Sequence, residues 1–140
     1  MSYASKTDMI KRYSEASLIE LTDRVQPYLQ AINDDVLNAA LDDATALINS
    51  FVGKLYRLPI SAVPSVLVRH TCSIAYYDLH RGRYPDEVRK EYEDTMSYLD
   101  KIAKKVVVLD LDGSEPQSAL AEARVEGPAR IFNRDSLKSF

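Results

Sequence analysis

The chain has little of the material from which several kinds of site are built. Its 140 residues include four glycines, one cysteine and no tryptophan. Neither a P-loop nor a GxGxxG motif occurs, so the common glycine-rich phosphate-binding loops are missing. The single Cys72 excludes an internal disulfide and fits a reducing compartment. A nucleotide site built on one of these loops is therefore excluded, and so is a fold held together by internal disulfides.

Long apolar runs and a strong net charge are missing as well. No run approaches the ~20 apolar residues that cross a bilayer, and the start MSYASKTDMIKRY is too polar for a signal peptide. The net charge is −3, so bulk electrostatics does not favour nucleic acid or an anionic membrane. With 46% apolar and 28% charged residues, the chain can form one domain with a real core. We expect a soluble globular protein with no membrane partner.

The strongest pattern that is present is helical and spans residues 33–58. Its apolar residues alternate steps of four and three, which places them on one face of a helix: Leu37, Leu41, Ala44, Ile48, Phe51 and Leu55. Asn33 is a good N-cap, and Pro59 disfavours helical conformation at Leu58. A helix of this length cannot cover its apolar face alone. We therefore expect the rest of the chain to be organised around it.

Four further helices are predicted around this central one. Two short helices precede it, over residues 5–13 and from 14 to about 23. Two longer helices follow, from 64 to about 80 and from 85 to about 105, each with a proline in its first turn. Matching apolar faces and short links lead us to expect antiparallel pairing of the central helix with both later helices. Residues 106–111 are apolar and rich in valine, which predicts a short strand.

The sequence thus predicts a mainly α protein, a helical bundle built on a long central helix packed against two further helices, with a short β segment and an extended C-terminal arm. Residues 1–108 form the helical domain, and residues 109–140 hold the loop, the strand and the arm.

The last 14 residues, 127–140, show no convincing period. Gly127-Pro128 breaks any preceding helix, so we expect an assembly arm that is only loosely held in an isolated subunit. Its positive charge suits an acidic neighbour. The apolar and basic side chains expected to bind a partner are Arg130, Ile131, Phe132, Arg134, Leu137, Lys138 and Phe140.

The sharpest local motif is VVVLDLDGS at residues 106–114, which resembles the first motif of haloacid-dehalogenase-type phosphatases. In those enzymes the first aspartate, here Asp110, is the nucleophile, and the second, here Asp112, is a general acid. Too little chain follows to complete such a site, and the helices before it make no βαβ pattern. An EF-hand interpretation also fails, because the glycine comes too early. We interpret the motif as a coincidence.

Other charged and polar groups also suggest sites at first sight. His70, Cys72, Asp78 and His80 could bind a metal, but His70 and Cys72 are two apart on a helix and point away from each other. We expect a packed cysteine and two ordinary histidines.

Two charged groups are interpreted as solvated surface. One is the set of aspartates on the central helix, Asp34, Asp35, Asp42 and Asp43. The other is a basic cluster near Tyr84 and Tyr92, formed by Arg81, Arg83, Arg89 and Lys90, whose charge nearby acidic residues offset. We expect no catalytic, cofactor-binding or metal site, and hence no enzyme.

Several stretches together resemble one family. They are MSYASKTDMIKRYSEASLIELTDR, then ALDDATALINSFVGKLYRLPISAVPSVLVRHTCSIAYYDLH with its Tyr56, Leu58-Pro59 and Val63-Pro64 signature, YEDTMSYLDKIAKK, and RIFNRDSLKSF. Over nearly its whole length the chain is similar to a family of small Mu-like bacteriophage and prophage proteins. It departs from them around residues 29–33, where related chains often carry a longer acidic loop.

That family resembles phage head–tail connector proteins, also called head-completion or adaptor proteins. The resemblance implies a virion structural protein, made in the host cytoplasm, that oligomerises as a ring at the portal vertex. Its implied partners are further copies of itself, the portal and head or tail-completion proteins, with DNA passing non-specifically through the ring. No catalytic residues, cofactor or metal are implied. The alternative is a small phage nucleic-acid-binding or regulatory helical protein, which would need a clustered basic face.

Overall fold

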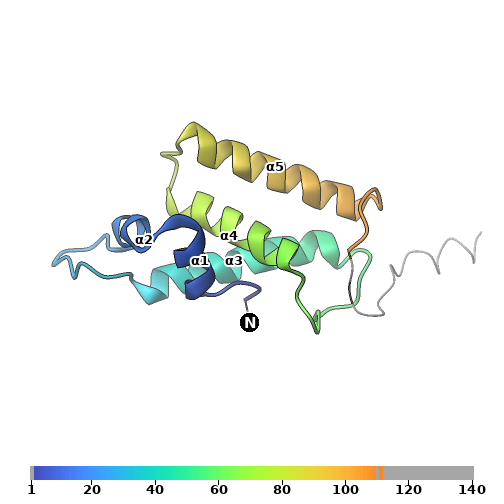
Figure 1. Cartoon of the computed structure of the whole chain (residues 1–140), viewed down its shortest axis with the longest axis horizontal. Helices are drawn as coiled ribbons and strands as arrows, with labels where there is room; N and C mark the ends of the chain where they lie inside the picture. The colour runs from blue at the N-terminus through green and yellow to red at the C-terminus, as the bar shows by residue number, and fades with distance from the viewer. Residues whose placement is uncertain (1, 110, 112–140) are drawn as a thin grey trace, which may run out of the picture.

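The computed structural model describes residues 2–109 and 111, which form five α-helices and no strand. In chain order the helices are α1 (Lys6–Tyr13), α2 (Glu15–Thr22), α3 (Asp34–Val52), α4 (Ser65–Leu79) and α5 (Asp86–Ala103). Figure 1 shows α3, α4 and α5 along the long axis of the body, with α1 and α2 toward one end. The predicted mainly α helical bundle is confirmed. No helix in this part of the chain is long and apolar enough to cross a membrane.

The three long helices reverse direction at each link (Figure 1). α4 therefore runs antiparallel to α3, and α5 runs antiparallel to α4. Two reversals leave α5 pointing the same way as α3. The predicted antiparallel pairing with the central helix is correct for α4 and wrong for α5, because both links are short and each turns the chain back.

The middle of α4 is buried on all sides, whereas α3 is not. Six consecutive residues of α4, 70–75, are buried, and six residues of an α-helix go round its whole circumference. α3 keeps a solvated face, on which the predicted aspartates Asp34, Asp35, Asp42 and Asp43 are exposed. The expected arrangement of the other helices around α3 is confirmed, since α3 packs against all four of them, while α4 is the helix with the most enclosed middle. An apolar stripe stands out in a sequence when the opposite face of the helix is polar and solvated. The middle of α4 has no solvated face.

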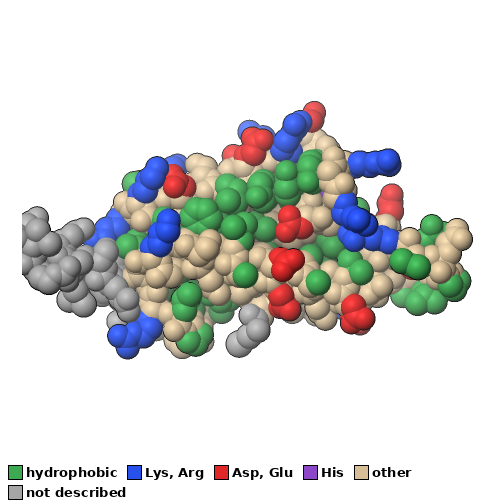
Figure 2. All heavy atoms as spheres, turned by 180° about the vertical axis from the view of Figure 1, so that it is seen from behind, with side chains coloured by type: hydrophobic (Ala, Val, Ile, Leu, Met, Phe, Trp, Pro, Cys, Tyr) green, Lys and Arg blue, Asp and Glu red, His purple; other side chains and the backbone are tan. Residues whose placement is uncertain are grey.

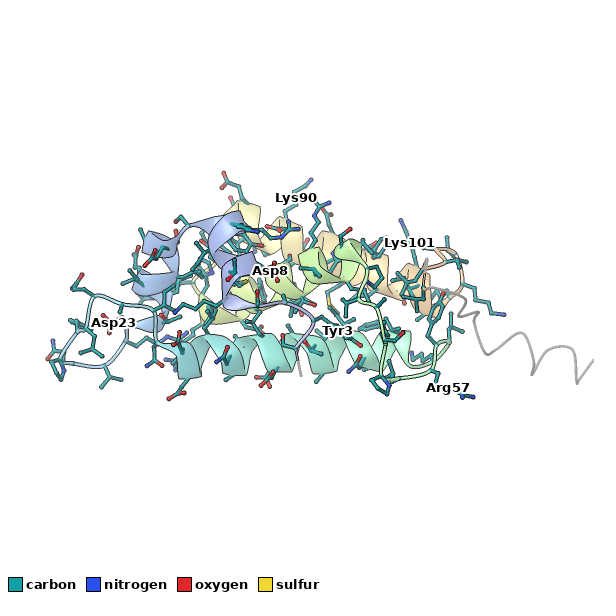
Figure 3. All side chains as sticks on the ribbon, turned by 60° about the horizontal axis from the view of Figure 1, so that its bottom comes forward. Tyr3, Asp8, Asp23, Arg57, Lys90 and Lys101 are labelled. Carbon is teal, nitrogen blue, oxygen red and sulfur yellow. The ribbon has the colours of Figure 1, made fainter. Side chains whose placement is uncertain are left out.

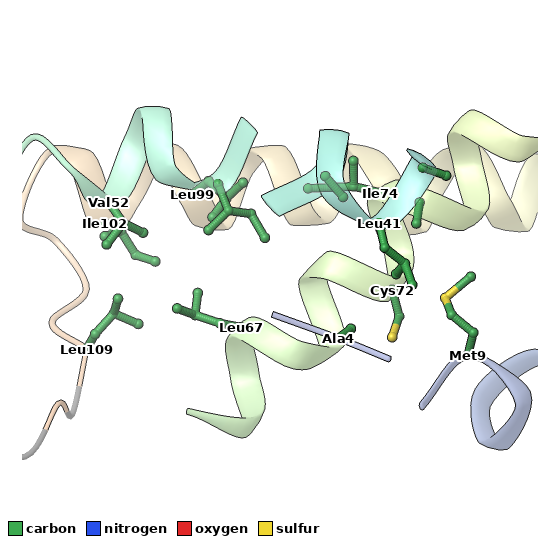
Figure 4. Close-up of a cluster of buried hydrophobic side chains, with 14 of the residues drawn as sticks. Ala4, Met9, Leu41, Val52, Leu67, Cys72, Ile74, Leu99, Ile102 and Leu109 are labelled. Carbon is green, nitrogen blue, oxygen red and sulfur yellow. The ribbon is translucent and has the colours of Figure 1, made fainter. Parts of the chain in front are cut away.

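The core draws side chains from all five helices and from the segments that follow α3 and α5. Figure 4 shows part of this cluster, in which Leu67 and Cys72 of α4 lie among residues of α1, α3 and α5. Burial of one such side chain contributes about 1.5–3 kcal/mol. The largest fully buried apolar side chains are Tyr56, Met9, Leu18, Leu37, Leu41, Ile48, Leu67, Ile74, Leu99, Ile102 and Val52.

Helix starts follow the local sequence. Ser5 Oγ accepts from the N–H of Asp8, and the Asp8 carboxylate accepts from the N–H of Ser5, which makes a capping box before α1. Asn33 Oδ1 accepts from two N–H groups in the first turn of α3. Pro64 and Pro85 are the N-cap residues of α4 and α5, one position before the predicted first turn, because both have the extended ψ of 149°.

α3 ends at Val52, earlier than the predicted end at Leu58. The N–H of Gly53 donates to the carbonyl of Asn49, and the chain then leaves the helix through turns. A Cβ at position 53 would lie 2.7 Å from the Asn49 carbonyl oxygen and 3.1 Å from Leu58 Cδ1. Glycine therefore permits the close return of the chain over the end of α3.

The periodicity missed this end because apolar residues stay buried in the turns. Leu55 and Tyr56, which follow the helix, are both in the core. Phe51, predicted on the buried stripe, is only partly buried, and its neighbour Val52 is fully buried instead.

The predicted strand at residues 106–111 is not formed in the described residues. Lys105 takes a positive φ of 65°, and the N–H groups of Val106 and Val107 both donate to the carbonyl of Lys101. This arrangement closes the C-terminal end of α5 and turns the chain back. The division into residues 1–108 and 109–140 stays a prediction, although Leu109 and Leu111 both pack in the core.

Candidate interaction surfaces

The largest exposed hydrophobic side chains gather at the two ends of the body. Three lie on the α2–α3 loop (residues 23–33) and three on the loops at the opposite end (Figure 1). Within the described ranges they are Val25, Tyr28, Leu29, Leu58, Val106 and Val108. Figure 2 shows the first group as hydrophobic side chains at the right-hand end of the body. Single exposed apolar residues are ordinary, but groups of them mark contact surfaces.

Hydrogen bonds fix the shape of the α2–α3 loop. At its base, the N–H of Asn33 donates to the buried Oγ1 of Thr22 at 2.9 Å. Inside the loop, the Asp23 carboxylate accepts from the N–H of Leu29 at 3.3 Å and from the N–H of Gln30 at 2.9 Å. The loop therefore presents its apolar tip in a preformed shape, so less conformational entropy is lost when it binds.

An apolar pocket opens where the N-terminal segment crosses the second half of α3. We call it the Pro59 pocket; its volume is about 260 Å³, and its walls are Tyr3, Thr45, Asn49, Leu58, Pro59, Ile60 and Val63. The side chain of Tyr3 donates from Oη to Oδ1 of Asn49, and its N–H donates to Oγ1 of Thr45 at 3.0 Å. These bonds hold the N-terminal wall in place and leave the apolar walls open.

The segment after α5 is anchored by Tyr56. Its Oη accepts the N–H of Leu109 at 2.9 Å, and both residues are buried. The anchor leaves Val106 68% and Val108 64% exposed. A specific hydrogen bond to the core therefore fixes the segment that presents Val106 and Val108.

A buried polar cluster links α4 to α5. His70 Nδ1 lies 2.9 Å from Thr95 Oγ1, and that hydroxyl donates to Ser73 Oγ at 3.3 Å. Because the threonine proton is used in the bond to Ser73, Nδ1 is the donor toward Thr95. Burial, followed by the positive charges of Arg69 and Arg12, lowers the pKa of His70 to about 4. The cluster joins two helices and leaves no ring charge at neutral pH.

Cys72 faces away from His70, as its spacing predicted. It lies in the buried cluster that also holds Met9 of α1 (Figure 4), and burial raises the pKa of the thiol to about 11. His80 Nδ1 donates to the carbonyl of Tyr76 at 2.7 Å. Over residues 2–109 and 111, no group of three or more His, Cys, Asp or Glu side chains is placed to hold a metal ion.

Part of the basic cluster between α4 and α5 is engaged within its own segment. Arg89 Nη2 lies 2.9 Å from the Asp86 carboxylate. The ring of Tyr77 stacks between Tyr84, at 4.0 Å between centroids, and Tyr92, at 3.8 Å. Tyr77 therefore offers no free face on which a nucleic-acid base could stack. These contacts favour the interpretation as solvated surface.

A second pocket, of about 360 Å³, gathers two arginines and two aspartates near the C-terminal end of α4. Arg24 Nη2 donates to the carbonyl of Leu79 at 3.0 Å. Burial and then the charge of Asp43 raise the pKa of Asp78, while burial and then the charge of Arg81 lower the pKa of Arg24. In the described part of the chain, none of these four side chains forms a salt bridge. The pocket is charged but carries no recognisable catalytic arrangement.

The site residues predicted from the sequence, Arg130, Ile131, Phe132, Arg134, Leu137, Lys138 and Phe140, lie outside the described residues. So do Asp110 and Asp112 of the DxDG motif. The expectations about both therefore stay predictions.

Sequence reasoning missed the apolar tip of the α2–α3 loop. A connection between helices has no period that says which side chains point outward. The available signal was composition, since Val25, Tyr28 and Leu29 are large apolar residues in a segment that should be polar.

Comparison with known proteins identifies a family for the whole body. The sequence profile of the family described as "Bacteriophage Mu, Gp36" matches residues 3–126. The chain is similar to the Mu-like prophage FluMu protein gp36 of Haemophilus influenzae, with 35% identity over 139 residues, which cover 99% of this chain and 97% of the relative. It is also similar to gene product J of Escherichia phage Mu, with 31% identity over 102 residues, which cover 73% and 72% of the two chains.

Proposed function

We propose that this chain, which belongs to the Bacteriophage Mu Gp36 family, is a head–tail connector subunit that oligomerises as a ring at the portal vertex. The observation that carries the proposal is the grouping of exposed large hydrophobic side chains at the two ends of the body. A subunit in a ring touches a neighbour on each of two sides. It therefore needs two contact surfaces that face in different directions.

The difference between the two ends supports a ring over a simple dimer. One end has a projecting loop tip, and the other has a pocket and a pair of exposed valines. A two-fold dimer repeats one self-complementary patch, whereas a ring joins one surface to a different one. Two unlike apolar surfaces on one rigid body fit the second arrangement.

The partners of the ring are, in this proposal, the portal and the head or tail-completion proteins. Residues 127–140 form the assembly arm, with basic and apolar side chains that dock on an acidic neighbouring surface. DNA passes through the ring without sequence-specific contact. The protein is made in the host cytoplasm and ends in the virion.

Interruption of the gene in the phage that encodes this chain tests the proposal. We expect DNA-filled heads and complete tails to accumulate separately, and a plasmid copy to restore joined particles. Mass spectrometry should find the chain in purified virions. Normal yields of infectious particles without the chain, or virions that lack it, would overturn the proposal. A regulator would instead change phage gene expression, or bind duplex DNA with a steep dependence on salt.

A further inference from the structure

We propose that neighbouring subunits are joined by the tip of the α2–α3 loop of one copy, seated in the Pro59 pocket of the next. The loop tip consists of Val25, Tyr28 and Leu29. The inference rests on the proposed ring and names the contact that forms it.

Among residues 2–109 and 111, nothing covers the apolar tip. Val25 and Leu29 are each 77% exposed, and Tyr28 is 54% exposed. Because the loop is fixed by Asp23 and Thr22, these side chains cannot simply collapse onto the body. Contact with a second copy would remove them from water.

The Pro59 pocket has a size and lining that suit such side chains. Its volume of about 260 Å³ is below the roughly 300–1,000 Å³ of sites that take drug-sized ligands. Leu58, Pro59, Ile60 and Val63 supply apolar walls, and the polar groups of Tyr3 are already bonded to α3. One or two apolar side chains of a partner match this space better than a polar metabolite.

The two surfaces lie too far apart for one copy to fill its own pocket. Figure 3 places Asp23, in the loop, at one end of the body and Arg57, next to the pocket, at the other. The loop is fixed at both of its bases by α2 and α3, so it cannot cross this distance. A loop tip seated in this pocket therefore belongs to a second copy, arranged head to tail.

Charge favours the same arrangement. Residues 14–35, which carry the loop and its two bases, contain five acidic residues and one basic residue. Residues 44–77, which carry the pocket, contain three basic residues and no acidic residue. Lys54 and Arg57, just before the pocket, are exposed. Head-to-tail approach brings an acidic surface against a basic one, whereas loop-to-loop approach brings acidic surfaces together.

Disulfide cross-linking of the full-length protein tests this contact. Two single variants, Leu29→Cys and Ile60→Cys, are mixed and oxidised; Ser61→Cys, at an exposed neighbouring position, replaces Ile60→Cys if that variant is unstable. The native Cys72 is buried and stays silent in the folded protein. A disulfide needs Cα atoms within about 7 Å, so only a close contact gives a product. Leu29→Cys mixed with Ser97→Cys, at an exposed position on α5, is the matched control.

We expect the mixture to give covalent dimers at least about tenfold above the control, with little product from either variant alone. The double variant Leu29→Cys/Ile60→Cys should give a ladder of larger products, because each copy then carries both halves of the contact. Yields at the control level in a wild-type-like assembly would overturn the inference and leave the ring standing on another contact. Efficient self-linking of Leu29→Cys alone would overturn it in favour of a loop-to-loop dimer. A wild-type chain that stays monomeric, with and without portal, would overturn the proposed ring itself.

Discussion

The middle of α4 and the tip of the α2–α3 loop both depart from the rule that apolar residues lie inside and polar ones outside. α4 buries His70, Thr71 and Ser73, and each finds a hydrogen-bond partner within the chain; Thr71 Oγ1, for example, donates to the carbonyl of Leu67 at 2.7 Å. The loop exposes Val25 and Leu29, and nothing in the described chain covers them. The interior exceptions are satisfied by folding, while the surface exceptions require a partner.

The largest difference between the two regions should appear when one leucine in each is replaced by alanine. Leu67→Ala, in α4, should lower the free energy of unfolding by about 2–5 kcal/mol, because the side chain is fully buried and leaves a cavity. Leu29→Ala should change it by less than about 0.5 kcal/mol, because the loop tip is solvated in the monomer. Urea denaturation followed by circular dichroism, at concentrations where the chain is monomeric, measures both. Similar losses for the two variants would mean that the loop tip is part of the core.

The lowered pKa of the buried His70 should make the free energy of unfolding depend on pH. In the folded chain the pKa is about 4, and in the unfolded chain it is near the ordinary 6.5. Between these values the unfolded chain binds the proton and the folded chain does not. The free energy of unfolding should therefore fall as pH falls from about 6.5 to about 4, by up to about 3 kcal/mol from this residue.

His70→Gln is the control for that prediction, since the carboxylates common to both proteins cancel in the difference. Urea denaturation at several pH values should show a weaker loss of stability in the variant over the same window. Parallel pH profiles for the two proteins would show that His70 is not held neutral by burial.

Two Tyr→Phe substitutions, one in the core and one in the loop, compare the two regions by the removal of a single hydroxyl. Tyr56→Phe should lower the free energy of unfolding by about 1–3 kcal/mol, because it leaves the buried N–H of Leu109 without its acceptor. Tyr28→Phe removes an exposed hydroxyl in the loop and should have no measurable effect. Thermal melts of the two variants provide the measurement. Equal shifts in Tm would contradict the anchoring role of Tyr56.

Deletion of residues 127–140 should have the smallest effect on stability of all. Helix content and Tm should stay nearly unchanged, because the described helices and core precede this segment, while ring formation or portal binding should be lost. Circular dichroism and native mass measurements separate the two effects. A truncated chain that unfolds would place the segment in the core, and one that assembles normally would remove its role as an arm.

Much of the helical body could be predicted because the deciding signals are local. Ser5 with Asp8, and Asn33 before its two aspartates, mark helix starts within a few residues of sequence. The end of α3 was missed because Leu55 and Tyr56 stay buried in the turns after it, so the apolar pattern continues past Val52. The enclosure of residues 70–75 of α4 was not predicted, because a segment buried all round shows no amphipathic stripe.

The candidate interaction surface was predicted less well than the fold. The sequence directed attention to residues 127–140, where apolar and basic residues alternate without a helical period. Its one sign of the α2–α3 loop tip was composition, and it could not show that Leu29 is exposed, because the loop is shaped by the Asp23 carboxylate, which accepts from two N–H groups across it. Nor did it reveal the Pro59 pocket, which forms only when Tyr3 packs against α3.

Sedimentation equilibrium of the wild-type chain beside Leu29→Asp tests most directly the claim that the exposed loop tip serves association between copies. At the same series of concentrations, the wild type should rise well above the monomer mass of 15.8 kDa, and the variant should stay at that mass with an unchanged Tm. The carboxylate would have to lose its water on entering an apolar pocket, which strongly disfavours binding. Identical mass distributions for the two folded proteins would contradict the claim.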